Sequence, residues 1–336
     1  MLPLLAQPAL SQKVSGSVNS KRIIKPKRLK AGDTVGVIAP SRSISAEGFA
    51  RALQTMKDLG FKTKVGQFAQ GEKGFLSGTD QERLHDLHWA FSDPEIAAVW
   101  CARGGYGLSR LLPDVDYKLI KKNPKIFIGY SDITALHVAI FQNTGLVTFH
   151  GPVAASEMSD YSKTHVVNAL MNPSAPYKIE LSPYNQAQTS PLFKTETITP
   201  GRCRGPLIGG NLSLLSAMAG TPSGLKNLKG KILFTEDIEE RPYRVDRMLT
   251  QLRQSVDLRA LAGIALGIFE GCNPPAGRPS QTVQDVLRDR LGDLGLPVIY
   301  GLSFGHIRDQ CTLPTGVEAE LDTEKATLTL LETGVV

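Results

Sequence analysis

The stretch Lys125-Ile-Phe-Ile-Gly-Tyr-Ser-Asp-Ile-Thr-Ala-Leu-His137 decides the fold. Its apolar run 126–128 has the length of a buried strand and is too short for a helix. Gly129 ends this run, and the helical apolar spacing of 133–141 follows it. Ser131 therefore stands in a strand–turn–helix geometry typical of a nucleophile elbow, where the helix N-terminus offers N–H donors to an oxyanion. The alternative is a serine that only caps the helix.

The bulk composition indicates a globular protein of about two domains. The chain has 336 residues, of which 41% are hydrophobic and 21% charged, and domains of roughly 100–200 residues are usual. The net charge of +6 is matched by six cations in one N-terminal stretch: Lys21, Arg22, Lys25, Lys27, Arg28 and Lys30. The rest of the chain is close to neutral and shows no basic face, so we expect no nucleic-acid partner.

The cysteines and the apolar runs argue against three further classes of protein. The four cysteines (Cys101, Cys203, Cys272 and Cys311) form no CxxC pair, which argues against a structural zinc site and a disulfide scaffold. No apolar run reaches the ~18 residues of a membrane span. Residues 1–12 look like the end of a secretory signal, but they lack a positive n-region and a full apolar stretch. Either the true start lies upstream, or residues 1–30 form a disordered tail.

Residues 31–155 have the pattern of a first, α/β domain. Buried-type strands are predicted at 34–39, 61–65, 96–102, 126–128 and 146–149, with helices over 46–59 and 79–92 and the start of another at 108–112. Strands that alternate with helices favour a parallel sheet covered by helices. The next segment, 156–200, is rich in Ser, Pro, Asn and Thr, and its weak periodicity indicates a linker or excursion between domains.

Residues 201–336 have the pattern of a second domain that is rich in β-structure. We expect a turn followed by a helix over 205–218, and helices over 243–253 and 282–291. Strands are predicted at 231–235, 262–269 and 297–300, with a closing hairpin formed by 318–321 and 326–331.

A glycine-rich loop, Arg103-Gly-Gly-Tyr-Gly107, directly follows the third strand of the first domain. Carboxyl ends of parallel strands share one edge of a sheet, and ligands bind beyond that edge. Gly104 and Gly105 are therefore expected on the same edge as Ser131, where exposed backbone N–H groups suit an acyl-transfer site. A tight turn without a catalytic role is the alternative for these glycines.

The base and its orienting group are sought among the histidines and acids of the second domain. His306 lies in a glycine-flanked loop after a strand, and Glu236 ends another strand. Together with Ser131 they supply a nucleophile, a base and a group that orients the base. The order Ser, Glu, His is that of α/β-hydrolases, but the G-x-S-x-G motif is absent because position 133 is Ile.

The chain resembles the LD-carboxypeptidases of serine peptidase family S66, which includes the muramoyltetrapeptide carboxypeptidases. The resemblance runs in unbroken order over about 30–330 and rests on Gly32-Asp-Thr-Val35, Ala39-Pro-Ser41, Ala102-Arg-Gly-Gly-Tyr-Gly107, Ile128-Gly-Tyr-Ser-Asp132, His150-Gly-Pro152, Gly209-Gly-Asn-Leu212, Glu236-Asp-Ile238, Pro242-Tyr-Arg-Val-Asp-Arg247, Gly305-His306 and Leu313-Pro314 with Gly316.

The resemblance implies a catalytic triad of Ser131, Glu236 and His306. It implies an oxyanion hole from the Gly104–Gly105 loop and the backbone N–H of Asp132. It further implies a flavodoxin-like N-terminal domain, a smaller, swivelling, β-rich C-terminal α/β domain, a homodimer, and neither a metal nor an organic cofactor. Glu239 and Glu240 follow Glu236 closely, so the identity of the orienting glutamate stays open between Glu236 and Glu239; we prefer Glu236 because it ends the strand.

The implied reaction is release of the terminal D-alanine from peptidoglycan-derived tetrapeptides through an acyl-enzyme on Ser131. An exopeptidase needs a cation for the terminal carboxylate, and bidentate recognition favours arginine. Arg103 is the nearest candidate, with Arg244 and Arg247 as others, and Tyr130 is placed in the substrate site.

Two rival functions stay open. The microcin-immunity branch of the family cleaves aminoacyl or peptidyl nucleotides and would need an aromatic platform for the base, for which Trp89 and Trp100 are the available tryptophans. A non-catalytic peptide-binding or sugar-binding protein is the second rival. A peptide-recycling enzyme would be cytoplasmic, whereas a signal peptide upstream of Met1 would make it periplasmic.

Overall fold

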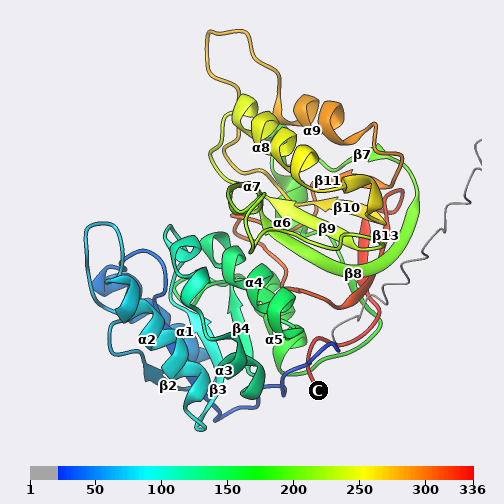
Figure 1. The fold of residues 1–336 in the computed structure, drawn as a ribbon. Coiled ribbons are helices and arrows are strands. Elements are labelled where there is room, and N and C mark those ends of the chain that lie inside the picture. Colours follow the sequence, from blue (N-terminus) through cyan, green and yellow to red (C-terminus); the bar gives the residue numbers. More distant parts are fainter. Residues whose placement is uncertain (1–21) are drawn as a thin grey trace, which may run out of the picture.

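The computed structural model describes residues 22–336 and contains two sheets, each covered by helices (Figure 1). The first sheet has the strand order β2-β1-β3-β4-β5-β12. Its strands are β1 (Thr34–Ile38), β2 (Lys62–Val65), β3 (Ile96–Cys101), β4 (Ile126–Gly129), β5 (Phe149–His150) and β12 (Leu313–Pro314). The strands β1 to β5 are parallel, and β12 runs antiparallel to β5. The order 2-1-3-4-5 is that of flavodoxin-like folds, so the predicted flavodoxin-like architecture of the N-terminal domain is confirmed.

Two layers of helices cover this sheet. They are α1 (Ala46–Asp58), α2 (Asp80–Ser92), α3 (Tyr117–Lys122), α4 (Thr134–Thr144) and α5 (Asp160–Leu170). The helices α1 and α5 share a core cluster with Ile126 and Ile128, whereas α2, α3 and α4 pack with Phe127. Because neighbouring strand residues point to opposite faces, these two groups cover opposite sides of β4. The site-bearing strand is therefore buried on both faces.

Short-range signals explain why the helices begin and end where they do. Thr79 and Glu82 form a capping box at the start of α2, which satisfies two backbone N–H groups that have no partner within the helix. Ser45 caps α1. The helix α4 ends at Gly145, whose φ of 81° is in the left-handed region, a conformation that glycine adopts without steric cost.

The second sheet has eight strands in the order β6-β14-β13-β8-β9-β10-β11-β7. They are β6 (Tyr177–Ile179), β7 (Glu196–Thr199), β8 (Arg202–Asn211), β9 (Ile232–Glu236), β10 (Gly263–Leu266), β11 (Val298–Tyr300), β13 (Glu318–Asp322) and β14 (Thr327–Leu330). The central strands β8 to β11 are parallel. The helices of this half are α6 (Pro183–Ala187), α7 (Leu212–Ala217), α8 (Pro242–Ser255) and α9 (Val283–Leu291).

The segment 205–211 is a strand, not the turn expected there. Gly205, Gly209 and Gly210 look like turn residues, yet all three lie within β8. The structure requires glycine here because the backbones approach closely: a β-carbon at Gly209 would lie 1.7 Å from the carbonyl oxygen of Phe234. Glycine in a strand often marks such an approach. The expected helix start at 108–112 is likewise two 3₁₀ turns, including η1 (Leu108–Arg110).

The segment 156–200 contributes more structure than a linker. It contains α5, α6 and the strands β6 and β7, which form the two edges of the second sheet. For this reason the second sheet has more strands than the first. The segment is polar because edge strands and short helices leave much of their surface in water.

Residues 22–30 also depart from the predicted tail, because they pack against the first domain and the C-terminal segment. Leu29 is 1% exposed, Ile24 forms a bridge with Leu146, and Lys25 pairs with Glu332 at 2.6 Å. The backbone N–H of Arg28 donates to the carbonyl of Val336, and the N–H of Val336 donates to the carbonyl of Pro26. Residues 1–21 of the predicted tail, with the signal-like segment, lie outside the described residues. Within 22–336, no helix is long and apolar enough to cross a membrane.

Candidate active site

Ser131 lies at the C-terminal end of β4, in the 3₁₀ turn η3 (Ser131–Ile133) that leads into α4. Its φ of +65° is in the left-handed region, which a residue with a β-carbon adopts at a cost. Neither η3 nor α4 receives a cap hydrogen bond from a side chain. The helix-cap interpretation of Ser131 is therefore wrong, and the strained turn matches a nucleophile elbow.

The loop after β3 lies directly against this serine. A β-carbon placed on Gly104 would be 2.9 Å from the Ser131 β-carbon and 3.1 Å from the Tyr130 carbonyl oxygen. Gly105 has a φ of +122°. Only glycine lets the backbone pass this close to Ser131, so the expected proximity of this loop and the serine is present.

The carboxylate of Asp132 holds three loops together at the end of the sheet. Its Oδ2 atom accepts hydrogen bonds from Ser41 Oγ at 2.7 Å and from the backbone N–H of Leu108 at 3.0 Å. The residue is 1% exposed, and burial raises the pKa of its carboxyl group. Asp132 thereby fixes the loop after β1 and the turn η1 against the turn that carries Ser131.

Glu236 and His306 form a hydrogen-bonded pair at the end of β9. His306 Nδ1 lies 2.7 Å from Glu236 Oε2, and the glutamate side chain is 0% exposed. Burial disfavours the charged imidazole, but the Glu236 carboxylate outweighs it and raises the pKa of His306. Burial likewise opposes ionisation of Glu236, and His306 nevertheless holds the pKa of Glu236 below its usual value. The pair therefore favours the ionic form.

Glu239 does not occupy this position. Its side chain is exposed, its φ is 54°, and its backbone N–H donates to the carbonyl of Glu270 at 2.7 Å. The carboxylate that contacts His306 is that of Glu236.

Contacts between the two halves place the histidine close to the serine turn. The rings of Tyr130 and His306 lie 4.8 Å apart between centroids, and Tyr130 immediately precedes Ser131. On the same seam, the backbone N–H of Asn211 donates to Thr134 Oγ1 at 2.9 Å. The strand β8 thus meets the first turn of α4.

Two further buried acid–base groups flank the pair. Asp237 accepts from Asn211 Nδ2 at 3.0 Å and from the backbone and hydroxyl of Ser213 at 2.9 and 2.8 Å. Burial, followed by the charge of Glu236, raises the pKa of Asp237 to about 6. His150, at the end of β5, is 0% exposed, and burial lowers its pKa to about 4. It packs behind Tyr130 as a neutral ring.

The predicted substrate-binding arginines lie in different surroundings. Arg103 is half-buried, and its Nη1 donates to the carbonyl oxygen of Ser43 at 3.0 Å. Arg244 is exposed on α8, where it pairs with Glu240 at 3.4 Å and lies 5.9 Å from the ring centroid of Tyr243. Arg103 immediately precedes Gly104, which lies against Ser131. Arg244 forms no hydrogen bond or ion pair with the predicted catalytic residues.

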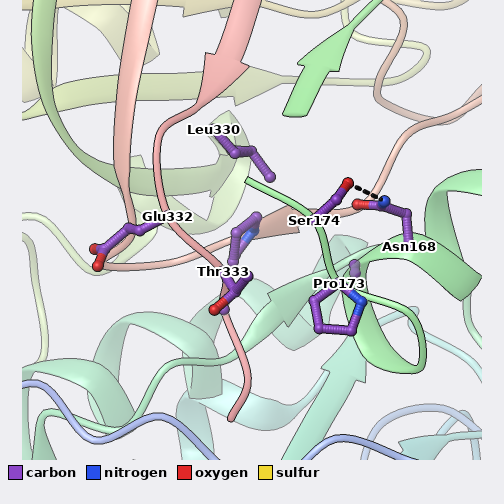
Figure 2. Close-up of a pocket in the computed structure, with 9 residues that line it drawn as sticks. Asn168, Pro173, Ser174, Leu330, Glu332 and Thr333 are labelled. Atoms are coloured by element: carbon purple, nitrogen blue, oxygen red, sulfur yellow. Dashed lines mark hydrogen bonds between the residues drawn. The ribbon is translucent and has the colours of Figure 1, made fainter. Parts of the chain in front are cut away.

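Two other features of residues 22–336 do not coincide with the predicted site. No group of three or more His, Cys, Asp or Glu side chains in this range is placed to hold a metal ion. Figure 2 shows a pocket between the end of α5 and the C-terminal segment, where Asn168 Nδ2 donates to Ser174 Oγ at 3.0 Å. None of the predicted site residues lines this pocket.

Sequence reasoning missed Ser41, Thr134 and Asn211 as contacts of the site. Ser41 and Asn211 belong to motifs that carry the family resemblance, and these motifs could have pointed to them as contacts of the site. Thr134 had no signal beyond its position after Ser131. Their partners are 77 or more residues away in the chain, so local patterns could not reveal them.

Comparison with known proteins identifies the family. The LD-carboxypeptidase N-terminal domain model of family S66 matches residues 35–151, and the corresponding C-terminal domain model matches residues 204–321. A Bacillus subtilis protein named "Probable murein peptide carboxypeptidase" is 42% identical over 93% of this chain and 95% of its own length. The murein tetrapeptide carboxypeptidase of Pseudomonas aeruginosa is 33% identical over 86% and 92%.

Solved structures share the whole fold. The muramoyltetrapeptide carboxypeptidase from Oxalobacter formigenes has a TM-score of 0.73 and 30% identity, with 89% of this chain and 99% of the other covered. The microcin C7 self-immunity protein MccF, in complex with aspartyl sulfamoyl adenosine, has a TM-score of 0.83 and 27% identity over 93% and 100%. The chain belongs to the LD-carboxypeptidase family, peptidase family S66.

Proposed function

We propose that this protein is a serine LD-carboxypeptidase that releases the terminal D-alanine from peptidoglycan-derived tetrapeptides. The observation that carries the proposal is the buried pair of Glu236 and His306, 2.7 Å apart, whose imidazole packs on the residue before Ser131. This arrangement supports a triad of Ser131, His306 and Glu236. The names of the relatives from Bacillus subtilis and Pseudomonas aeruginosa support the substrate.

The chemistry follows from the roles of these three side chains. Nε2 of His306 takes the proton of the Ser131 hydroxyl as Oγ attacks the carbonyl that precedes the terminal D-amino acid. The buried carboxylate of Glu236 holds Nδ1–H and stabilises the imidazolium. The imidazolium then protonates the leaving amine, so the amide bond breaks and an acyl-enzyme remains on Oγ. Water, deprotonated by His306, hydrolyses that ester and restores the serine.

The tetrahedral intermediate needs donors for its oxyanion. We assign this role to the backbone N–H groups of the Gly104–Gly105 loop and of Asp132. The close approach of Gly104 to Ser131 supports the first, and the position of Asp132 in the first turn after the nucleophile supports the second. Donors fixed in advance at this point stabilise charge that develops only in the transition state. Tyr130, Arg103 and Arg244 are assigned to substrate binding.

The direct test is chromatography of a defined tetrapeptide after incubation with the wild type and with Ser131→Ala. We expect release of D-alanine and the tripeptide by the wild type, and loss of release in the variant. Labelling of Ser131 by a fluorophosphonate adds an independent readout, because a binding protein without an activated serine would not react. Equal release by both proteins would refute the proposal.

Cleavage of aminoacyl nucleotides is the second candidate, favoured by the likeness to MccF. Trp100 is fully buried and cannot stack on a base, but Phe75 and Tyr106 are 55% and 51% exposed and meet edge to face at 5.4 Å. Such rings suit stacking. Incubation with aspartyl sulfamoyl adenosine separates the two functions, since release of aspartate faster than release of D-alanine would favour the second.

The resemblance further supports two proposals about the molecule in the cell. The first is a homodimer, which light scattering coupled to size exclusion tests through the molar mass. The second is a role in the cytoplasm, where recycled tetrapeptides would be processed. Fractionation of the native host tests the compartment, and recovery of the protein in the periplasm would overturn it.

A further inference from the structure

The loop after β1 brings a second arginine to the edge that carries Ser131. Arg42 follows Ser41, whose hydroxyl donates a hydrogen bond to the Asp132 carboxylate. The side chain of Arg42 packs on Gly105, since a β-carbon there would lie 2.6 Å from the Arg42 β-carbon and 3.3 Å from its δ-carbon. Arg42 is therefore held next to the loop that touches the serine.

The Arg103 guanidinium lies close to Arg42, because it contacts the backbone of Ser43, the next residue in the chain. Burial, followed by the Arg42 charge, lowers the pKa of Arg103. Ser43, the neighbour of Arg42, holds this arrangement in place. Its carbonyl oxygen accepts from Arg103 Nη1 at 3.0 Å, and its backbone N–H donates to the Phe75 carbonyl at 3.3 Å. Neither guanidinium forms an ion pair with any carboxylate among residues 22–336, although Arg110 on the adjacent turn pairs with Asp80 at 2.8 Å.

Two neighbouring cations without a counterion repel each other, and an anion placed between them relieves the repulsion. Guanidinium groups bind carboxylates through paired, charge-assisted hydrogen bonds. If the proposed function is right, the leaving residue carries a free carboxylate one residue beyond the scissile bond. We infer that Arg42 and Arg103 form a two-arginine clamp for the terminal carboxylate of the substrate, and that this clamp makes the enzyme an exopeptidase.

In the clamp the terminal carboxylate binds both Arg42 and Arg103, so the loss of either cation weakens its binding. The clamp also separates Arg103 from Arg244, whose charge is already balanced by Glu240 at 3.4 Å. A peptide whose terminal carboxylate is blocked would leave the two arginines without a counterion. It would lose the interactions that position its last amide bond.

The test compares one tetrapeptide with its C-terminal carboxamide, using the wild type, Arg42→Gln, Arg103→Gln and the control Arg110→Gln. We expect the wild type to prefer the free acid strongly. Arg42→Gln and Arg103→Gln should each reduce the acid-to-amide ratio of kcat/KM by about 10- to 100-fold, as for a lost hydrogen bond to a charged group. Arg110→Gln should preserve the ratio, although it removes a charge from the same edge.

Binding to Ser131→Ala gives a readout that does not need turnover. Calorimetry should show weaker binding of the amide than of the acid, and a difference that shrinks when Arg42→Gln is added. An unchanged preference in Arg42→Gln, in turnover and in binding, would overturn the clamp while leaving the proposed function intact. Failure of the wild type to release D-alanine would instead refute the proposed function. Arg42→Lys tests geometry, because it keeps the charge but loses the paired donors.

Discussion

The Nδ1 atom of His306 lies 2.7 Å from Oε2 of Glu236, and this contact joins two residues 70 positions apart. The glutamate is completely buried, whereas the histidine side chain retains 11% exposure. A buried carboxylate without a partner would be unstable in its ionised form. The imidazole supplies that partner through Nδ1, and the proposed triad gives the role of base to its other nitrogen, Nε2.

Glu236→Gln should abolish most of the activity without unfolding the protein. The amide has nearly the same shape, but it cannot stabilise the imidazolium and can favour the wrong tautomer. A fall in kcat of about 10³- to 10⁴-fold is expected from the loss of an orienting carboxylate in such triads. Release of D-alanine measures it, with Glu239→Gln as the matched control, which should keep most of the rate. Full activity in Glu236→Gln would contradict the proposed triad.

The helices and strands that were predicted correctly have local signals in the sequence. The strand of Phe127 and the helix after it follow from apolar spacing, and α2 follows from Thr79 and Glu82. The strand β8 was not predictable in the same way. Its glycines are there because other backbones approach them, as Phe234 approaches Gly209, and such a contact leaves no periodic pattern in the sequence.

The same distinction between local signals and tertiary contacts applies to the site residues. Ser131 and Gly104 could be placed on one edge from sequence, because carboxyl ends of parallel strands share that edge. The positions of Glu236 and His306 after strands made them candidates for a pair, and the family resemblance supported the pairing, since nothing local links two residues so far apart. Arg42 had no sequence signal, because its position depends on how the loop after β1 packs on Gly105.

The pH profile of kcat/KM should fall on its acidic side as His306 becomes protonated. Although burial opposes it, Glu236 raises the pKa of His306 above its ordinary 6.5. The base must be neutral to accept the serine proton, so kcat/KM should fall about tenfold per pH unit below that pKa and level off above it. Removing the charge in Glu236→Gln should move the limb to lower pH.

A second carboxyl could produce a similar limb, so the pH profile needs a control. The pKa of Asp237 is raised to about 6, and its charge also acts on His306. Asp237→Asn should shift the limb less than Glu236→Gln does. An equal or larger shift in Asp237→Asn would assign the limb to Asp237 instead.

The strain at Ser131 predicts a difference between two inactive variants. Its φ of +65° costs an L-residue roughly 1–2 kcal/mol, and glycine avoids that cost. Part of the gain is offset because glycine loses more entropy on folding. Ser131→Gly should therefore be more stable than Ser131→Ala by about 1 kcal/mol in urea unfolding, with both variants inactive. A more stable Ser131→Ala would show that the turn relaxes in the absence of the hydroxyl.

Gly104→Ala should reduce activity while leaving the fold intact. The added methyl group would lie 2.9 Å from the Ser131 β-carbon and 3.1 Å from the Tyr130 carbonyl, so the loop must move away from the serine. Displacement of an oxyanion donor costs about 10²- to 10³-fold in kcat. The matched control is Gly36→Ala in β1, whose methyl group would meet only side-chain atoms, those of Ile96 at 3.0 Å and of Ala90 at 3.5 Å. Gly36→Ala should keep kcat, even where Tm falls slightly. Wild-type kcat in Gly104→Ala would place the oxyanion donors elsewhere.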